Sequence, residues 1–574
     1  MSFRNKKHNY PLYETTHFSD FREMTEQVAK NYPDKVAFKF KKDPRNKEAQ
    51  SVTFSESRDF IRDLGTELHA IGIEGKKVAL VGVASVEWFF SYVALMSSGA
   101  VTVPIDKELP AADIASIINT SAAEYIFFSA SVYEKISEVK ALCPSVTNLV
   151  SMGGECEGAT SLVSMRESGA KRYADADDSY YTYEIDREGL ASIVFTSGTT
   201  GKGKGVMLSL KNICSDMEQG MYNFRITERT LFALPPHHTF GSTVNFIGHF
   251  AQGCEIYISS GLRYILDELK YFKPTHLILV PLFVETFYKK IMATAEKSGQ
   301  LDKLKKGIKI SNILYKLGID VRQKLFGKSV LASFGGELKM IICGGAALNQ
   351  NIIDFFESIG IVILNGYGIT ECAPIIAVNH NYYKVDGSVG PVLTIDDIKI
   401  NEPNEDGEGE IYVKGPNVML GYFKDEEATK EAFDEEGYFK TGDYGKYRES
   451  DRVLFITGRK KNLIILSNGK NVYPEEIENE LAATPGVLEI IVYEGKSRRG
   501  DMYNAIVAEI FPDYDFMKKN GIENVENYLQ EYVNKYNKTA VPYKKIAILK
   551  VRTEEFPKNT LRKILRFKLD MSID

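Results

Sequence analysis

Residues 193–209, IVFTSGTTGKGKGVMLS, combine the residue types that bind phosphate groups. An apolar run is followed by four glycines, which let backbone N–H groups turn toward an anion. Hydroxyl groups add further donors and two lysines add positive charge. The candidate phosphate contacts are Thr196, Ser197, Gly198, Thr199, Thr200, Gly201, Lys202 and Lys204. We expect this loop to hold the phosphates of a nucleoside triphosphate.

The same loop fits most of a second phosphate-binding pattern. Residues 198–204 match G-x-x-x-x-G-K, the start of the P-loop of kinases and ATPases. The next position of a P-loop needs Ser or Thr to bind magnesium, whereas this chain has Gly205. A kinase or ATPase would therefore lack its metal ligand, and release of ADP would be the observation that supports this alternative.

A second segment with candidate functional residues, LNGYGITECAP at 364–374, begins at the end of the apolar run 361–364. Ligands in parallel sheets bind at the carboxyl ends of the strands. Glycines there would let the backbone approach a flat base beside an aromatic ring, while a hydroxyl and a carboxylate lie just beyond. The residues concerned are Asn365, Gly366, Tyr367, Gly368, Thr370 and Glu371. The alternative is a turn with a buried tyrosine and a surface glutamate.

Three further segments carry candidate residues. In YFKTGD, Asp443 could accept two hydrogen bonds from a ribose diol, although T-G-D is also a common turn. In LPPHHTFG, His238 is one of two adjacent histidines, and a single histidine more often has a structural role. Residues 544–568 contain nine basic and two acidic residues, which suits a solvated helix face or a weak membrane-surface patch as well as a site.

The elements that must position these residues are typical of an α/β protein. Short apolar runs bounded by turn residues predict strands that are buried on both faces, at 78–83, 125–128, 277–281, 340–343 and 361–364. Segments with helical periodicity lie between them, at 85–96, 111–118 and 349–359. We therefore expect mostly parallel sheets with helices.

The pattern of turn residues and hydrophobic periodicity changes at two places toward the C-terminus. After residue 396, turn-rich and alternating segments predict a small β-rich subdomain. After 459–461, the sequence P-E-E-I predicts a new helix start, followed by strands at 487–493 and 503–510. We expect a large N-terminal domain, 1–460, and a smaller α+β domain, 461–574.

Composition limits the classes of function. The 574 residues are 44% hydrophobic and 26% charged, with a net charge of −6, which argues against disorder and against nucleic acid as the main partner. Six scattered cysteines show neither zinc nor disulfide spacing, and no export signal is recognised. Residues 88–105 are uncharged, and we expect a buried helix and a strand rather than a membrane span. A cytoplasmic protein with at most peripheral contact at the inner membrane face is predicted.

Taken in order, these segments resemble the motifs of the adenylate-forming superfamily, which includes acyl-CoA synthetases, firefly luciferase and peptide-synthetase adenylation domains. T-S-G-T-T-G-x-x-K-G-V is similar to its phosphate loop and G-Y-G-x-T-E to its adenine and magnesium motif. Two departures are Gly203, where the family usually has proline, and Leu561-Arg562, where it usually has Ser-Gly. The resemblance covers nearly the whole chain and is closest to long-chain fatty acid–CoA ligases.

The resemblance implies a role for each matched residue. ATP would contact Thr196, Ser197, Gly198, Thr199, Thr200, Gly201, Lys204, Gly344, Gly345, Ala346, Asn365, Gly366, Tyr367, Gly368, Thr370, Asp443 and Arg459. Magnesium would bind Glu371 and Thr196. The catalytic residues would be Glu371, His238 at the carboxylate end of the acyl pocket, and Lys563, with Lys558 as a rival. Lys461 would be the hinge of a mobile C-terminal domain, and Gly469 and Lys470 would face coenzyme A.

The implied activity is an AMP-forming ligation of an acid to a thiol. A carboxylic acid and ATP would give acyl-AMP and pyrophosphate, and the acyl group would then pass to coenzyme A, with ATP, Mg²⁺ and coenzyme A required. Residues 280–291 and the helix-rich stretch after them resemble long-chain members, so we expect a medium- to long-chain fatty acid. The alternatives are an acyl carrier protein as the thiol partner and, more remotely, a non-catalytic nucleotide-binding regulator.

Overall fold

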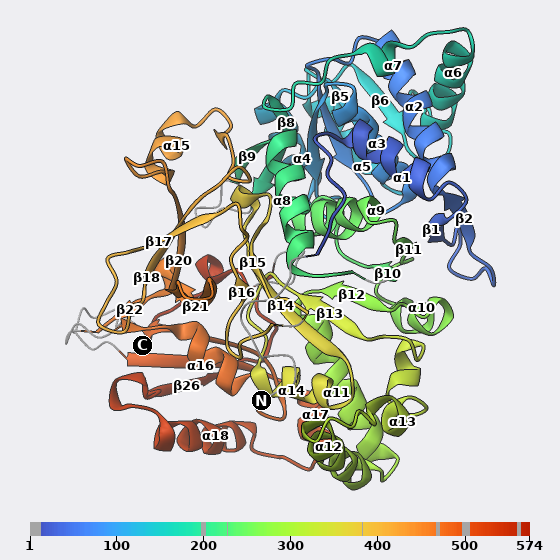
Figure 1. Cartoon of the computed structure of the whole chain (residues 1–574). Coiled ribbons are helices and arrows are strands. Elements are labelled where there is room, and N and C mark those ends of the chain that lie inside the picture. The colour runs from blue at the N-terminus through green and yellow to red at the C-terminus, as the bar shows by residue number, and fades with distance from the viewer. Residues whose placement is uncertain are drawn as a thin grey trace.

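The computed structural model describes residues 13–196, 203–226, 228–381, 383–466, 471–495, 505–558 and 564–573. Figure 1 shows two large sheets with their helices, a smaller sheet beside them, and a C-terminal domain in orange and red. The predicted α/β class, with a large N-terminal domain of mostly parallel sheets and a smaller C-terminal domain, is confirmed.

The first sheet has eight strands in the order β15-β14-β13-β12-β10-β11-β1-β2. Its strands are β1 (Val36–Phe40), β2 (Gln50–Thr53), β10 (Arg229–Phe232), β11 (Glu255–Ile258), β12 (His276–Leu279), β13 (Met340–Cys343), β14 (Val362–Gly368) and β15 (Ile375–Val378). All neighbours are parallel except the two edge pairs, β1–β2 and β14–β15. Every residue of β12 and β13 is buried, as expected for strands that are apolar throughout.

The second sheet has eight strands in the order β19-β9-β8-β4-β3-β5-β6-β7. They are β3 (Lys77–Val81), β4 (Val101–Ile105), β5 (Tyr125–Phe128), β6 (Asn148–Ser151), β7 (Thr160–Ser161), β8 (Leu190–Thr196), β9 (Lys204–Ser209) and β19 (Gly421–Tyr422). Strand β9 is antiparallel to β8 and to β19, and the other neighbours are parallel. The phosphate-loop sequence therefore joins two adjacent antiparallel strands.

Most helices of the N-terminal part lie between these strands in sequence, while α1 precedes β1 and α15 follows β19. The helices are α1 (Phe21–Asn31), α2 (Phe54–Ala70), α3 (Val86–Ser97), α4 (Ala111–Ser121), α5 (Tyr133–Leu142), α6 (Leu162–Ala174), α7 (Ser179–Thr182), α8 (Leu210–Asn223), α9 (Gly248–Ala251), α10 (Ile265–Phe272), α11 (Pro281–Lys297), α12 (Leu301–Lys316), α13 (Arg322–Phe326), α14 (Gln350–Ser358) and α15 (Glu426–Ala432). A π-helix spans Phe240–Ile247.

The uncharged run 88–105 folds as the sequence predicts. Ser85 caps α3 by accepting a hydrogen bond from the backbone of Trp88, and the following β4 is buried along its whole length. In the described part of the chain, no helix is both long enough and apolar enough to cross a membrane.

The third sheet is antiparallel, in the order β16-β21-β20-β18-β17. It consists of β16 (Gly390–Pro391), β17 (Asp397–Asn401), β18 (Gly409–Lys414), β20 (Phe439–Arg448) and β21 (Val453–Arg459). The last four strands form the β-rich part predicted after residue 396, and β16 adds a short strand before it. The longest pair, β20 and β21, places Asp443 opposite Arg459.

The C-terminal domain contains β22 (Ile464–Ile465), β23 (Asn471–Val472), α16 (Pro474–Leu481), β24 (Val487–Gly495), β25 (Ala505–Pro512), α17 (Tyr514–Lys519), α18 (Val525–Thr539) and β26 (Ile548–Val551). Pro474 is the first residue of α16, as predicted from its sequence. Hydrogen bonds between described residues join this domain to the helices and loops of the first sheet. Lys289 Nζ donates to the Val487 carbonyl at 3.1 Å, and Asn349 Nδ2 donates to the Asn479 carbonyl at 2.6 Å.

Candidate active site where three sheets meet

Strand β14 continues through the predicted adenine motif and does not end before it. Sequence reasoning placed the strand end at Leu364, but Gly366 and Gly368 pair with β15 in antiparallel register. A Cβ atom on Gly368 would lie 2.0 Å from the Pro374 carbonyl oxygen, so only glycine allows this close approach. The motif therefore spans the end of the β14–β15 strand pair and the turn that joins the two strands, and is not a separate loop.

Tyr367 and Asp443 come from different sheets and meet at this hairpin. The Tyr367 hydroxyl donates a hydrogen bond to Asp443 Oδ2 at 2.7 Å, and Arg459 Nε lies 3.1 Å from Asp443 Oδ1. Asp443 is almost completely buried, and its backbone N–H donates to Thr441 Oγ1 at 3.1 Å. The three residues that sequence motifs placed around adenine and ribose therefore form one connected group.

Burial and charge shift the pKa values of this group. Burial, and then the adjacent Asp443 carboxylate, raise the pKa of Tyr367 well above its usual value, so this residue is a neutral hydrogen-bond donor. The same carboxylate raises the pKa of Arg459, which is cationic at any physiological pH.

Glu371 lies on the 3₁₀ turn that follows β14 and touches the second sheet. Its Oε1 accepts a hydrogen bond from the Tyr422 hydroxyl at 3.1 Å, and its backbone carbonyl accepts one from Met419 N–H at 2.8 Å. Burial raises the pKa of Glu371, while the Tyr422 hydroxyl opposes that shift by stabilising the carboxylate. Lys204 Nζ lies 4.5 Å from the centre of the Tyr422 ring, so one tyrosine contacts both predicted motifs.

The Gly344 turn and the His238 turn also lie together. Gly344 is buried directly after β13, while Gly345 and Ala346 are exposed. A Cβ on Gly344 would come within 3.2 Å of Phe240 Cζ, and Phe240 N–H lies 3.4 Å from His238 Nδ1. The turn proposed for the acyl carboxylate is thus next to the turn proposed for the adenine wall.

The remaining predicted contacts are placed as follows. Thr196 ends β8, and its hydroxyl donates to the Lys204 carbonyl at 3.4 Å across the strand pair. Asn365 lies in β14, where its carbonyl accepts from Asn379 N–H at 2.9 Å, and Thr370 is buried at the start of the turn that carries Glu371. Ser197, Gly198, Thr199, Thr200, Gly201 and Lys202 lie outside the described residues.

The C-terminal candidates are described only in part. Lys461 lies in a 3₁₀ turn, Lys460–Asn462, between β21 and β22. Lys558, the rival to Lys563, forms ion pairs with Glu489 and with Glu555, and these raise its pKa against the lowering effect of burial. Lys563, Gly469 and Lys470 lie outside the described residues.

Sequence reasoning missed a buried polar network under the Glu371 turn. Asn417 Nδ2 donates to the Ile375 carbonyl at 3.0 Å and to Asp396 Oδ2 at 3.2 Å, and lies 3.5 Å from Asp216 Oδ1. Asp216 Oδ1 also accepts from Ile375 N–H at 3.0 Å. Burial raises the pKa of Asp396 to about 8, so its carboxyl group is largely neutral near pH 7.

This network and Tyr422 had little signal in the sequence. Tyr422 follows Gly421, whose φ of +140° and close contact with Thr429 require glycine, and this glycine–aromatic pair was the one local cue. Asn417 is 21 residues from Asp396 and 201 residues from Asp216, so only the fold brings the three side chains together.

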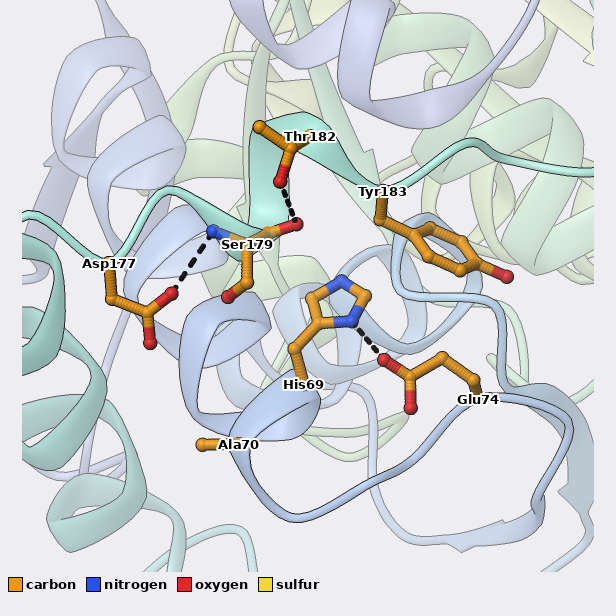
Figure 2. Close-up of a pocket in the computed structure, with 7 residues that line it drawn as sticks. All are labelled: His69, Ala70, Glu74, Asp177, Ser179, Thr182 and Tyr183. Carbon is orange, nitrogen blue, oxygen red and sulfur yellow. Dashed lines mark hydrogen bonds and ion pairs between the residues drawn. The ribbon is translucent and has the colours of Figure 1, made fainter.

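A surface hollow of about 330 Å³ lies apart from these residues (Figure 2). It is lined by His69, Ala70, Glu74, Asp177, Ser179, Thr182 and Tyr183. His69 Nδ1 and Glu74 Oε1 pair across it, and the Asp177 carboxylate accepts a hydrogen bond from Ser179 N–H at 3.1 Å. No residue of the predicted site lines this hollow, which lies at the C-terminal end of α2.

The donor set at the three-sheet junction suits a magnesium nucleotide. A carboxylate offers about four lone-pair positions, so Asp443 can accept two ribose hydroxyls while retaining Tyr367 and Arg459. Among the described residues, no group of three or more His, Cys, Asp or Glu could hold a metal. Mg²⁺ usually binds through one or two carboxylates together with substrate phosphates, so the half-buried carboxylate of Glu371 matches that need.

Comparisons with known proteins identify the class. The family model described as AMP-binding enzyme matches residues 25–423, and the chain belongs to this family. The ATP-bound MatB structure from Rhodopseudomonas palustris superposes with a TM-score of 0.72 over 95% of this chain and 97% of that chain, at 24% identity, which establishes the shared fold.

The similarity to curated relatives covers most of the sequence. The long-chain-fatty-acid–[acyl-carrier-protein] ligase AEE15 of Arabidopsis thaliana is 29% identical, covering 82% of this chain and 74% of the relative. The long-chain-fatty-acid–CoA ligase FadD15 of Mycobacterium bovis is 28% identical, covering 77% of this chain and 75% of the relative. With the site described above, the chain is an AMP-forming acid–thiol ligase.

Proposed function

We propose that this ligase activates a medium- to long-chain fatty acid and transfers the acyl group to coenzyme A. The observation that carries the proposal is the convergence of three motifs at one junction: Tyr367 with Asp443, and Glu371 with Tyr422 beside Lys204. The fatty acyl substrate is supported by the relatives named as long-chain ligases.

A thiol cannot displace oxide from a carboxylate, so the first half-reaction gives the carboxylate carbon a better leaving group, AMP. A carboxylate oxygen of the acid bonds to the α-phosphorus of ATP, the bond to the pyrophosphate oxygen breaks, and acyl-AMP and pyrophosphate result. In this proposal Tyr367, Asp443 and Arg459 orient the nucleoside, while Thr196 and Lys204 contact the phosphates. A magnesium ion bound by Glu371 and Thr196 would neutralise phosphate charge, and Lys563 would offset charge that grows at the α-phosphate.

The second half-reaction consumes the anhydride. The thiol sulfur bonds to the acyl carbon, the carbon–oxygen bond to AMP breaks, and the thiol proton is released. We propose residues 461–574 as a mobile domain that turns about Lys461 between the two steps, with Gly469 and Lys470 on the thiol side. The Lys289–Val487 and Asn349–Asn479 hydrogen bonds would then have to break during the motion.

Isotope exchange between pyrophosphate and ATP, measured across acids from acetate to oleate, tests the proposal. Exchange that rises with chain length supports a fatty acid, whereas exchange only with short or amino acids contradicts it. The thiol acceptor is tested separately by adding coenzyme A or a phosphopantetheinyl carrier protein.

The test with a carrier protein is included because the relative from Arabidopsis thaliana is named as a ligase for an acyl carrier protein. Thioester formation with the carrier protein and none with coenzyme A would replace our proposal by that alternative. Absence of exchange with every acid would favour the non-catalytic nucleotide-binding protein.

A further inference from the structure

Helix α12 exposes a line of large aliphatic side chains. Ile310, Ile313 and Leu317 are 52%, 60% and 71% exposed, and their spacing of three and four residues places them on one face of the helix and its C-terminal end. We call these three residues the α12 strip. Ile319, just beyond it, is 52% exposed. Scattered exposed leucines are ordinary on protein surfaces, but a contiguous aliphatic row indicates an interaction site.

The opposite face of α12 fixes the orientation of the strip. Ser311 Oγ donates to the Ser358 carbonyl at 3.0 Å, and Asn312 Nδ2 donates to Ser358 Oγ at 3.0 Å, at the end of α14. Leu304 is buried against the same part of the fold. The helix therefore already has a packed face, and the strip points away from it. Figure 1 shows α12 at the lower edge of the molecule.

Positive charge surrounds the strip. Residues 301–328 contain eight basic side chains and two acidic ones, in a chain whose net charge is −6. The basic residues are Lys303, Lys305, Lys306, Lys309, Lys316, Arg322, Lys324 and Lys328. Arg322 is engaged by Asp320. Lys306 and Lys309 are exposed one helical turn before Ile310 and Ile313, and Lys303 is exposed one turn before Lys306.

The composition of this surface distinguishes between classes of partner. Protein–protein interfaces are depleted in lysine, and their energetic centres are enriched in Trp, Tyr and Arg. A second copy of the chain would bring the same lysines against these, because a two-fold contact uses the same patch on both subunits. Aliphatic residues flanked by lysines are instead typical of helices that lie at an anionic bilayer surface, where the lysines reach the headgroups.

We propose that the α12 strip and its flanking lysines form a docking surface for an anionic lipid bilayer. The aliphatic side chains enter the headgroup–acyl boundary, and the lysines contact lipid phosphates. This proposal does not depend on the identity of the acid or of the thiol. Where the substrate is an apolar acid, the surface would hold the enzyme at the phase in which that substrate is most concentrated.

Co-sedimentation of the full chain with vesicles tests the proposal. We expect binding to vesicles of phosphatidylcholine mixed with phosphatidylglycerol, and much weaker binding to phosphatidylcholine alone. The triple variant Ile310→Ser/Ile313→Ser/Leu317→Ser should lower the partition coefficient at least about tenfold, because several partly inserted aliphatic groups are lost. The matched control, Leu142→Ser/Val163→Ser, removes aliphatic residues that are each 53% exposed elsewhere and should leave binding unchanged.

A second variant tests the electrostatic part. Lys303→Gln/Lys306→Gln/Lys309→Gln should weaken binding to the anionic vesicles by roughly fivefold for each lysine that contacts the surface. Lys171→Gln/Lys430→Gln/Lys535→Gln removes the same charge from α6, α15 and α18 and should have little effect. Pyrophosphate exchange in detergent-free solution should be unchanged in all variants, which separates this proposal from that of the catalytic function and shows that the variants fold.

Four results would overturn the proposal. They are no binding of the unaltered chain to anionic vesicles, binding that survives both α12 variants, a self-association that the strip variants abolish, and capture of an acidic carrier protein that depends on the strip while vesicles do not bind. The third would assign the strip to a second copy and the fourth to a protein partner.

Discussion

The Tyr422 hydroxyl donates a hydrogen bond to Glu371 Oε1 at 3.1 Å and links the strand that follows the phosphate loop to the proposed metal ligand. Tyr422 lies in β19, where it pairs with Val206 of β9, whereas Glu371 follows β14 of the first sheet. Because burial disfavours the ionised carboxylate, a donor at this position keeps Glu371 available for a cation.

Replacing Tyr422 with phenylalanine should shift the pH dependence of adenylation. Burial already raises the Glu371 pKa, so activity that needs the carboxylate falls as the pH is lowered through that pKa. Loss of the Tyr422 donor raises the pKa further, and the acidic limb of the pyrophosphate-exchange profile should move to higher pH by about one unit. Tyr438→Phe is the control, because Tyr438 donates to the exposed Asp397 and its loss should leave the profile in place.

Two substitutions at Tyr367 should separate the role of its ring from that of its hydroxyl. Tyr367→Phe removes the donor to Asp443 but keeps the aromatic surface, so we expect a rise in the KM for ATP of about threefold to tenfold. Tyr367→Ala also removes the surface and should cost at least about tenfold more in kcat/KM. Equal effects of the two variants would contradict a stacking role. Thermal unfolding of both variants checks that the fold is intact.

The sequence predicts the sheets and the motif residues because their signals are local. Apolar runs identified β5 and β13 with the observed bounds, and motif spacing identified Tyr367 and Asp443, which meet although 76 positions separate them. The continuation of β14 to Gly368 could not be read locally, since it depends on pairing with β15.

The supporting contacts could not be predicted for a similar reason. Asn417 contacts Asp396 across 21 positions and lies near Asp216 across 201, and each of these side chains looks like an ordinary surface residue in sequence. The fold alone places them together in the interior. Polar residues that the fold buries are the part of a site that motif reading misses.

Asp396 should give stability an unusual pH dependence. Its pKa is raised from 3.8 to about 8 in the folded chain, so the folded state holds a proton that the unfolded state releases. The stability contributed by the neutral carboxyl is present below pH 3.8 and is lost as the pH rises through 8, by roughly 1.4 kcal/mol per pH unit at most. Asp216, whose pKa burial also raises, faces it, while Arg452 opposes the shift.

Asp396→Asn removes that proton uptake. The urea midpoint of the variant, relative to the unaltered chain, should therefore rise as the pH is increased from about 5 to about 7.5. Asp397→Asn alters the adjacent exposed carboxylate and is the matched control for the change in side chain. A constant difference for Asp396→Asn would show that Asp396 is ionised in the fold.

Adjacent lysines provide a test of the proposed hinge. Lys461→Pro restricts the backbone of the Lys460–Asn462 turn and should slow thioester formation from supplied acyl-AMP more than pyrophosphate exchange, by about tenfold or more. Lys460→Ala is the control, because its Nζ pairs with Glu410 at 2.6 Å and its loss should affect both half-reactions slightly. A larger loss of exchange than of thioester formation by Lys461→Pro would refute the hinge.

Lys563 and Lys558 are distinguished by the half-reactions that they support. We expect Lys563→Ala to lower pyrophosphate exchange by at least about a hundredfold, because a cation at the α-phosphate would be lost, while thioester formation from supplied acyl-AMP persists. Lys558 is occupied by Glu489 and Glu555, so Lys558→Ala should preserve exchange and reduce thermal stability instead. The reverse result, with exchange lost in Lys558→Ala and kept in Lys563→Ala, would transfer the catalytic role to Lys558. Equal loss of both half-reactions in Lys563→Ala would contradict a role confined to adenylation.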